Sequence, residues 1–453
     1  MFRRLLIANR GEVAVRVLET CERLGVQVVA VTSQADDSLG WLGRASQVVC
    51  LGPARSSQSY LDQDNLLQAA LQTGATAIHP GWGFLAENAD FAARCEALGL
   101  TFVGPGPAVI RRMGDKIEAR ETMSALGMPL IPGSPGEVVD IDAARTEAER
   151  IGYPVLLKAA AGGGGRGMRR VFEPEGLEEG FQSASGESVA AFGNGALYME
   201  RLIVGGRHIE FQVLVDAFGN AMHLGERECS IQRRHQKLIE ESPSPAISAE
   251  QRAEMGQRVA EIAAKAGYRN AGTVEMLRDG TSGELFFMEM NTRLQVEHSV
   301  TEMVTGLDLV ELQLRIAANE PLDIEPPELQ GHAIEARINA EDPERDFLPS
   351  PGTITRLVWP QGEGIRVDSH LQEGDAISPH YDSMIAKVIA HGADRQQAIE
   401  RLKAALSQMV VEGVETTIPL HLRILDNAEF VSGDYDTTTL TRMLEAERGS
   451  NPS

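Results

Sequence analysis

The feature that most constrains the fold is a run of polar residues that directly follows a predicted buried strand. The strand is the apolar stretch at residues 285–288. Because side chains alternate between the two faces of an extended chain, a continued strand would place five polar residues on one face: Glu289, Asn291, Arg293, Gln295 and Glu297. Burying such a face costs free energy unless a ligand or a metal satisfies its polar groups.

A second predicted strand, at residues 273–277, precedes this stretch and is separated from it by turn-forming residues. A hairpin centred on Ser282 would set Glu275 opposite Glu289. Two carboxylates and the amide oxygen of Asn291 are the hard oxygen ligands that suit Mg²⁺. The alternative is an exposed strand whose charges face solvent. The mixture of ligand types beside a strongly apolar strand favours the metal site.

Length, charge and cysteine content narrow the class of protein. A chain of 453 residues is long enough for about three domains at roughly 150 residues each. Its net charge of -23 argues against general nucleic-acid binding and against adsorption to an anionic membrane, and leaves ATP binding open. No run approaches a membrane span, and the apolar start is too short for a signal peptide. Four scattered cysteines indicate a cytoplasmic protein without disulfides or zinc.

The first 114 residues alternate predicted strands and helices, with the strands at residues 5–8, 26–32, 75–79 and 101–104. This alternation predicts a parallel sheet joined by right-handed crossovers. The loop at residues 79–84 follows the end of a strand, where such folds place ligands. A proline- and glycine-rich loop around a packed Trp82 explains the same residues equally well.

A cluster of glycines lies between two further predicted strands, residues 154–158 and 168–172. Residues 162–167 formally match the G-x-G-x-x-G dinucleotide fingerprint, but that fingerprint requires a helix after the glycines. We therefore predict a mobile flap whose backbone N–H groups close on phosphate oxygens, with Lys158 as a point charge at its base. A surface hairpin is the alternative, and it does not need four consecutive glycines.

Local signals predict several helices in the middle of the chain. Capping boxes indicate helices that begin near Asp115 and Ser248, and a further capped helix is predicted over residues 308–318. The charged run at residues 226–237 separates two of these helices. A solvated surface is the more common outcome for such a run.

The character of the sequence changes at about residue 331, where short predicted strands begin. A helix over residues 396–409 is predicted to close the fold. Residues 446–453 are predicted to form a disordered tail, as chain ends often do.

Together these stretches resemble the biotin carboxylase component of biotin-dependent acyl-CoA carboxylases, an ATP-grasp family. The resemblance covers roughly residues 1–445 and rests on long motifs in the family's order: IANRGE at 7–12, the glycine cluster, CSIQRRHQK at 229–237, EMNTRLQVEHSVTE at 289–302 and RINAED at 337–342. It implies a multidomain α/β and α+β fold. The expected parts are a Rossmann-like pre-ATP-grasp domain (1–114), an ATP-grasp domain (115–330) with a mobile glycine-rich lid at about 131–203, and a mainly β C-terminal biotin carboxylase domain (331–445).

The resemblance also implies a site for ATP. The phosphates would be held by Lys116, Lys158, Gly163, Gly164 and Gly165. The rest of the nucleotide would be lined by Glu200, Leu202, His208, Gln232, His235 and Leu277.

A metal and bicarbonate would lie beside the nucleotide. By resemblance, the ligands of Mg²⁺ or Mn²⁺ would be Glu275, Glu289 and Asn291, and bicarbonate would be positioned by Lys237, Arg293, Gln295 and Val296. Glu297 would be the general base on bicarbonate, and Arg337 would stabilise the biotin enolate. The implied catalytic group is therefore Lys237, Arg293, Glu297 and Arg337.

The activity implied is ATP-dependent carboxylation of biotin through carboxyphosphate, giving N1-carboxybiotin, ADP and phosphate. The sequence contains no Met-Lys pair to accept biotin, so biotin is expected on a carrier protein, with a carboxyltransferase subunit as a further partner. A homodimer is expected from the family. Two alternatives are an ATP-grasp ligase that forms an acyl phosphate for attack by an amine, and a non-catalytic ATP-binding subunit. The residues from Arg293 to Glu297, with Arg337, favour the carboxylase.

Overall fold

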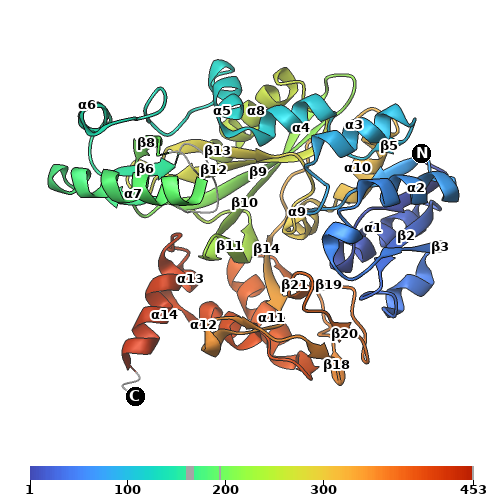
Figure 1. Cartoon of the computed structure of the whole chain (residues 1–453). Helices are drawn as coiled ribbons and strands as arrows, with labels where there is room; N and C mark the ends of the chain where they lie inside the picture. The colour runs from blue at the N-terminus through green and yellow to red at the C-terminus, as the bar shows by residue number, and fades with distance from the viewer. Residues whose placement is uncertain (160–167, 193–194, 451–453) are drawn as a thin grey trace. The chain divides into compact units, whose positions relative to one another are not determined.

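The computed structural model describes residues 1–159, 168–192 and 195–450. It divides the chain into two compact units. The first contains residues 1–128, 207–276 and 289–453, and the second contains residues 129–206 and 277–288. Each unit is described by itself below, with the element labels of Figure 1.

The N-terminal part of the first unit is a five-stranded parallel sheet with the order β3-β2-β1-β4-β5. This arrangement confirms the predicted parallel sheet. The sequence pattern did not indicate β3, an edge strand that is largely exposed. The strands are β1 (Arg4–Ile7), β2 (Gln27–Ser33), β3 (Gln47–Gly52), β4 (Ala77–His79) and β5 (Thr101–Phe102), and the helices are α1 (Gly11–Arg23), α2 (Gln63–Thr73), α3 (Ala89–Ala97), α4 (Pro107–Gly114) and α5 (Lys116–Ala125).

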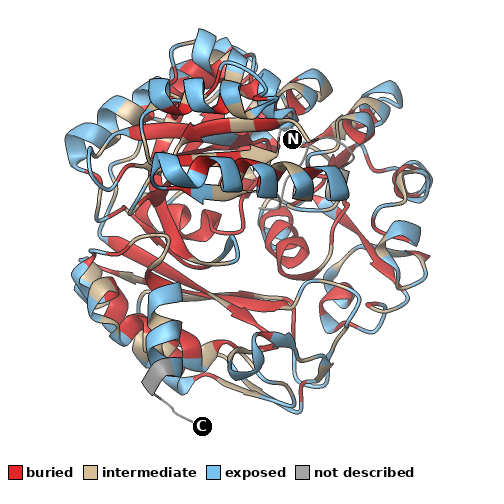
Figure 2. Cartoon of the chain, turned by 60° about the vertical axis from the view of Figure 1, so that its left-hand side comes forward, coloured by how far each residue is buried: buried red, intermediate tan, exposed pale blue. Residues whose placement is uncertain are grey.

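A second, eight-stranded sheet has the order β13-β12-β9-β10-β11-β14-β21-β19. Its strands are β9 (Arg207–Val215), β10 (Ala221–Arg233), β11 (Gln236–Ser242), β12 (Asn270–Arg278), β13 (Leu285–Asn291), β14 (His332–Asn339), β19 (Ile365–Ser369) and β21 (Met384–Gly392). The neighbours from β9 to β19 pair antiparallel. Strands β12 and β13 form the predicted hairpin. Figure 2 shows that the strands are mostly buried, whereas the helices expose one side.

Two helices pack on inner strands of this sheet. Helix α8 (Ala249–Lys265) packs on β9 and β10, and α9 (His298–Thr305) packs on β14 and β10. Helix α10 (Leu309–Ala317) contacts α1. The capping box predicted for α8 is present, because Ser248 and Gln251 each bond the other's backbone N–H. Asp115 likewise accepts two backbone N–H groups at the start of α5.

The solvated surface expected for the charged run at residues 226–237 is wrong for its first half, whereas residues 234–236, at the turn, are exposed. The run forms the end of β10 and the start of β11, and Glu226, Arg227 and Glu228 are fully buried. Each has an oppositely charged partner from another segment: Arg252 Nε lies 2.6 Å from Glu226, Arg227 Nε 2.5 Å from Glu210, and Arg207 Nε 3.0 Å from Glu228. Pairing with hydrogen bonds is what makes such burial tolerable.

The C-terminal region combines β14, β19 and β21 with three small two-stranded ladders. The ladder strands are β15 (Glu341–Asp342), β16 (Leu348–Pro349), β17 (Gly352–Thr353), β18 (Arg356–Val358), β20 (Ala376–Ile377) and β22 (Val410–Glu412). The predicted closing helix is α11 (Arg395–Gln408), but the chain continues into α12 (Ile418–Asp426), α13 (Ala428–Ser432) and α14 (Thr439–Ser450). Helix α14 thus occupies the start of the predicted disordered tail, and residues 451–453 lie outside the described part of the chain.

The second unit has a three-stranded sheet, with β6 (Val155–Ala159) between β7 (Arg169–Val171) and β8 (Leu197–Arg201). Helices α6 (Ile141–Ile151) and α7 (Leu177–Phe192) pack against each other and close a small apolar core. The two strands predicted around the glycine cluster are therefore present as an antiparallel pair. The cluster itself, with Gly163, Gly164 and Gly165, lies outside the described residues.

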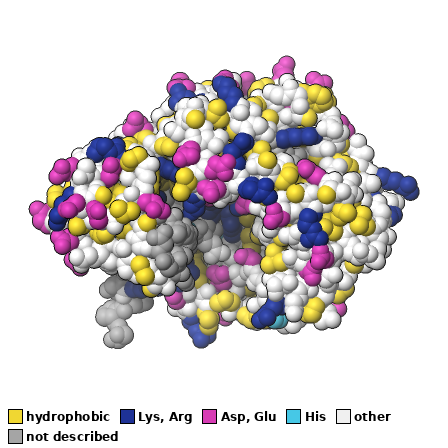
Figure 3. All heavy atoms as spheres, turned by 45° about the horizontal axis from the view of Figure 1, so that its top comes forward, with side chains coloured by type: hydrophobic (Ala, Val, Ile, Leu, Met, Phe, Trp, Pro, Cys, Tyr) yellow, Lys and Arg dark blue, Asp and Glu magenta, His cyan; other side chains and the backbone are white. Residues whose placement is uncertain are grey.

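Figure 3 shows acidic and basic side chains interspersed on one face of the molecule. Among the described residues, no helix combines the length and the apolar character needed to cross a bilayer.

Candidate active site

The centre of the candidate site is the carboxylate of Glu297, which lies at the N-cap of α9 and is fully buried. Its Oε1 accepts a hydrogen bond from Lys237 Nζ at 2.5 Å, and its Oε2 accepts one from Arg337 Nη2 at 2.9 Å. Burial and the charge of Glu210 favour the protonated form of Glu297. The cations Lys237, Arg337 and Arg227 outweigh them and hold the pKa of Glu297 below its usual value. Glu297 is therefore an ionised carboxylate at neutral pH.

Lys237 contacts three carboxylates of this cluster. From β11, its Nζ also donates to Glu210 Oε2 at 2.5 Å and to Glu275 Oε1 at 3.0 Å. Burial alone would favour the neutral amine, but three surrounding carboxylates outweigh it and raise the pKa of Lys237 well above its usual value. The side chain thus provides a permanent positive charge that three acidic groups share.

Arg337 lies on the neighbouring strand β14 and is held at both ends. Its Nε donates to Glu240 Oε1 at 2.5 Å, while its backbone carbonyl accepts from His421 Nε2 at 2.6 Å. Burial raises the pKa of Glu240 to about 7, although the Arg337 guanidinium opposes that rise. The guanidinium therefore has a fixed orientation between Glu240 and Glu297.

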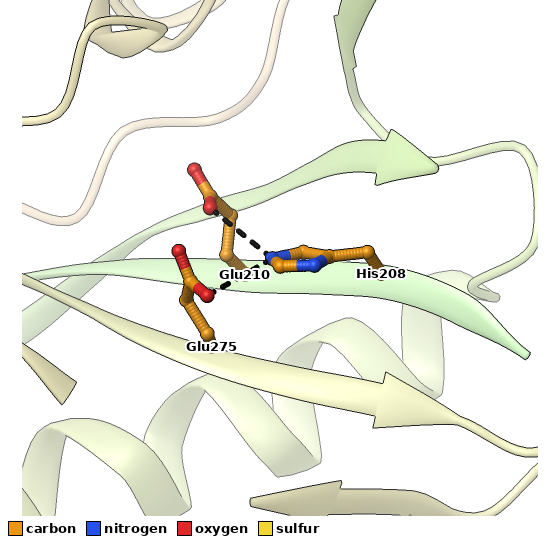
Figure 4. Close-up of side chains that lie close together, drawn as sticks. All are labelled: His208, Glu210 and Glu275. Carbon is orange, nitrogen blue, oxygen red and sulfur yellow. Dashed lines mark ion pairs between the residues drawn. The ribbon is translucent and has the colours of Figure 1, made fainter. Parts of the chain in front are cut away.

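A second group forms around His208 on β9. Figure 4 shows its ring directed towards Glu210 and Glu275, with Nε2 3.7 Å from Glu210 Oε2 and 3.3 Å from Glu275 Oε2. The other ring nitrogen lies 3.2 Å from Gln232 Nε2. Burial favours the neutral ring, but the charge of Glu275 and the proximity of both carboxylates raise the pKa of His208 to about 9. His208 is therefore cationic at neutral pH.

The continuous extended face predicted from Glu289 to Glu297 is wrong, because β13 ends at Asn291 and α9 begins at His298. The backbone bends at Arg293, and the preceding Thr292 N–H donates to Glu87 Oε1 at 3.0 Å. Arg293 nevertheless joins the predicted residues, since its guanidinium donates to Asn291 Oδ1 at 3.2 Å and to Gln295 Oε1 at 3.0 Å.

Two acidic residues of the site carried no sequence signal. Glu87, in the loop after β4, accepts Arg293 Nε at 2.9 Å as well as the Thr292 N–H. Glu210 sits in a fully buried strand and pairs with both Lys237 and Arg227. Their roles depend on partners more than 15 residues away, so only the tertiary structure reveals them.

The predicted metal ligands form a set that fits a divalent cation. Partial burial and the charge of Glu275 raise the pKa of Glu289, so the two carboxylates repel each other in the absence of a cation. Asn291 Oδ1 accepts a bond from Arg293 Nη2 at 3.2 Å, and its buried Nδ2 has no hydrogen-bond partner among the described residues. Carboxylate and amide oxygens are the ligands that Mg²⁺ and Mn²⁺ prefer. A cation between Glu210 and Glu275 would instead have to displace the Lys237 ammonium.

The remaining predicted residues lie outside this cluster. In the second unit, Lys158 Nζ forms an ion pair with the buried Glu200, and the Leu202 N–H donates to Pro154 O at 2.8 Å. Leu277 belongs to the same unit and packs beside Gly206. In the first unit, Lys116 and His235 are exposed, and His235 occupies the β10–β11 turn with a φ of 67°. Val296 is buried next to Glu297.

Family models match almost the whole chain in three consecutive blocks. They are the biotin carboxylase N-terminal domain at residues 1–110, the ATP-binding domain of the carbamoyl-phosphate synthase L chain at residues 115–325, and the biotin carboxylase C-terminal domain at residues 335–442. The order of the blocks is the order in which the two sheets and the C-terminal region appear.

Relatives of similar length share about half of their residues with this chain. Biotin carboxylase 1 of Bacillus subtilis is 51% identical over 442 residues, which cover 97% of this chain and 98% of that protein. Biotin carboxylase of Haemophilus influenzae is 50% identical, with coverages of 98% and 99%.

Solved structures agree with this assignment. A biotin carboxylase from Campylobacter jejuni, in a complex with β-γ-ATP, is 45% identical with a TM-score of 0.91 and covers 98% of this chain and 99% of that one. The biotin carboxylase domain dimer of Hydrogenobacter thermophilus 2-oxoglutarate carboxylase, in complex with MgADP, ADP and bicarbonate, is 46% identical with a TM-score of 0.90 and 98% coverage of both chains. The chain therefore belongs to the biotin carboxylase family of ATP-dependent ligases.

Proposed function

We propose that this chain carries out the first half-reaction of an acyl-CoA carboxylase, the carboxylation of biotin at N1 with bicarbonate and ATP. The observation that carries this proposal is the ionised Glu297 carboxylate, fully buried and held between Lys237 Nζ at 2.5 Å and Arg337 Nη2 at 2.9 Å. A base, a compact cation and a planar cation thus meet at one point. The amine-activating ligase of the alternative hypothesis has no evident use for the Arg337 guanidinium.

Glu297 is the general base in this mechanism. It takes the proton of bicarbonate, and the carbonate oxygen attacks the γ-phosphorus of ATP, so that ADP leaves and carboxyphosphate forms. Lys237 and Arg293 hold the bicarbonate oxygens, and Gln295 orients them through its contact with Arg293 at 3.0 Å. Mg²⁺ or Mn²⁺ on Glu275, Glu289 and Asn291 would neutralise charge on the phosphates.

Arg337 acts in the second step. Carboxyphosphate breaks into CO₂ and phosphate, the phosphate takes the N1 proton of biotin, and N1 of the resulting enolate attacks CO₂. The enolate carries its negative charge on the ureido oxygen, where a fixed guanidinium stabilises it. The bond from Arg337 Nε to Glu240 at 2.5 Å supports this role, because it fixes the guanidinium before biotin arrives.

The proposed reaction also requires partners that bring biotin and receive the carboxyl group. Biotin would arrive on a biotin carboxyl carrier protein, and a carboxyltransferase subunit would pass the carboxyl group to the final acceptor. We place the chain in the cytoplasm as a homodimer. Four cysteines without disulfides are compatible with a reducing compartment.

Phosphate release from ATP by the isolated chain with Mg²⁺, measured with and without bicarbonate and free biotin, tests the proposal. Release that requires bicarbonate and increases with biotin is expected. ATP hydrolysis that is indifferent to both compounds would favour the amine-activating ligase. ATP binding without hydrolysis, also in the presence of a biotinylated carrier protein, would favour the non-catalytic subunit.

A further inference from the structure

A fully buried lysine lies directly beneath the turn that carries Glu297. Lys387, on β21, donates from Nζ to the Val296 carbonyl at 2.8 Å and to Ser299 Oγ at 2.8 Å. The same ammonium pairs with Glu12 Oε1 at 3.0 Å and with Asp368 Oδ2 at 3.3 Å. Both hydrogen-bond acceptors lie within two residues of Glu297, one on each side of it.

The strand register explains why Lys387 reaches this turn. Lys387 is the cross-strand partner of Arg337 on β14 and of Asp368 on β19, so the three side chains form one row on one face of the sheet. Helix α9 packs on β14 and β21. Its N-terminus has no side-chain cap at Glu297. The start of the helix is therefore held from the sheet, by Lys387 and by Asp368, which accepts a bond from Ser299 Oγ at 2.8 Å, and not by a cap of its own.

We propose that Lys387 is a positioning residue, whose bonds to Val296 and Ser299 hold the Glu297 carboxylate at the point where it meets bicarbonate. This inference rests on the proposed role of Glu297. A compact ammonium with three donors can serve the carbonyl, the hydroxyl and a carboxylate at once, whereas a planar guanidinium cannot adopt that geometry. The chain has only six lysines and uses arginine as its ordinary cation, so a buried lysine is an exceptional choice.

The competing explanation is that Lys387 only balances buried negative charge. Burial favours its neutral form, but Glu12, Glu335 and Asp368 outweigh that effect and raise the pKa of Lys387. Asp368 keeps two bonds from Arg366, at 2.6 and 2.8 Å, without the lysine. Among the described residues, however, the carboxylate oxygens of Glu12 have no hydrogen-bond partner, and their one ion-pair partner is Lys387.

A double variant separates the two explanations. Lys387→Met removes the ammonium, and Glu12→Gln removes the carboxylate that would be left without a cation, so the pair preserves the charge balance but not the bonds to Val296 and Ser299. Ser299→Ala breaks the bond from Lys387 together with the bond that Ser299 Oγ donates to Asp368 Oδ2 at 2.8 Å, without any change of charge, and it serves if the double variant fails to fold. Lys265→Met, at an exposed position of α8, is the matched control.

The readout is bicarbonate-dependent phosphate release, with kcat and the KM for ATP determined separately. We expect the double variant to lose about 10- to 100-fold in kcat with an unchanged KM for ATP, because a displaced base slows the chemical step. The kcat of Ser299→Ala should fall several-fold. Lys387→Arg should also have a lower kcat than the wild type, and the control should match the wild type. Wild-type kcat in a folded double variant, or in Ser299→Ala if the double variant does not fold, would overturn the proposal.

Amide hydrogen exchange at residues 297–301 gives a second readout that does not depend on activity. Faster exchange at this turn in the double variant or in Ser299→Ala, with unchanged exchange in α8, is expected. If the wild type shows no bicarbonate-dependent release, the proposed function fails, and exchange still decides whether Lys387 fixes the turn. Unchanged exchange in both variants would contradict the positioning role.

Discussion

At the scale of single residues, the site is a set of charges that are tolerable only together. Glu297 is fully buried and accepts bonds from Lys237 and Arg337, which are nearly buried. Arg337 also donates to Glu240. Removing one member of such a cluster leaves an uncompensated charge in the interior, which costs about 3–5 kcal/mol. Mutations here affect stability and chemistry at once, so each test needs a folding control.

Arg337→Ala should lower carboxylation of free biotin by about 10²–10³-fold, the scale for losing one preorganised donor to a developing oxyanion. The assay is incorporation of labelled bicarbonate into biotin, with circular dichroism to verify folding. Arg315→Ala, which removes an exposed arginine paired with Glu311, is the control and should behave as wild type. Normal biotin-dependent turnover in Arg337→Ala would contradict the assigned role.

At the scale of elements, local signals predicted what local interactions determine. The capping box of α8 and the hairpin of β12 and β13 follow from residues a few positions apart, and both are present. The charged end of β10 could not be predicted as buried, because its partners Arg207 and Arg252 come from distant segments. The candidate site is likewise assembled from residues that are far apart in the sequence.

The sequence placed five polar residues of the site on one extended face. The structure brings most of them together by another route, because the chain leaves the strand after Asn291, where Glu87 accepts the Thr292 N–H. The side-chain types in the sequence were therefore enough to identify these residues. The path of the chain that brings them together could not be predicted from the local pattern. The exposed positions of Lys116 and His235 show the same limit, since no periodic pattern fixes the orientation of a side chain at a helix start or in a turn.

One carboxylate joins the C-terminal helices to the large sheet. Glu241 on β11 is fully buried and binds His332 Nε2 at 2.5 Å, Arg395 at 2.7 and 3.0 Å, and the Tyr435 hydroxyl. Burial favours its neutral form, but the hydrogen bond from His332 and the charge of Arg395 outweigh it and lower the pKa of Glu241 to about 2. The attachment of this region is therefore sensitive to acid.

Because the folded pKa is lower than the unfolded value, Glu241 contributes stability above about pH 4.5 and loses it as the pH falls towards 2. Glu241→Gln should lower the free energy of unfolding at pH 7 by about 3 kcal/mol. The difference from the wild type should shrink between pH 4.5 and 2 in urea titrations. Glu429→Gln, in a half-exposed pair with Arg442, should cost less than about 1 kcal/mol. A pH-independent difference for Glu241→Gln would exclude the linkage.

At the scale of the whole molecule, the proposed reaction requires a partner that brings biotin, because the sequence contains no Met-Lys pair to accept it. The Hydrogenobacter thermophilus domain was solved as a dimer. Light scattering should accordingly give about 98 kDa, twice the 49.0 kDa of one chain. A monomer at micromolar concentration would contradict the expected homodimer.

A biotinylated carrier protein should be a better substrate than free biotin, because contacts of the carrier add binding energy that free biotin lacks. The comparison is kcat/KM for both substrates in the labelled-bicarbonate assay. The non-biotinylated carrier protein is the control and should accept no label. Equal kcat/KM for free and carrier-bound biotin would argue against a dedicated carrier partner.

The measurement that tests the account most directly is bicarbonate-dependent phosphate release by the wild type and by Glu297→Gln, which keeps the shape of the side chain and removes its basicity. The account predicts release that requires bicarbonate in the wild type and falls by about 10²–10⁴-fold in the variant, with ATP affinity unchanged. Wild-type release by Glu297→Gln would show that another group takes the proton and would contradict the central role of this buried carboxylate.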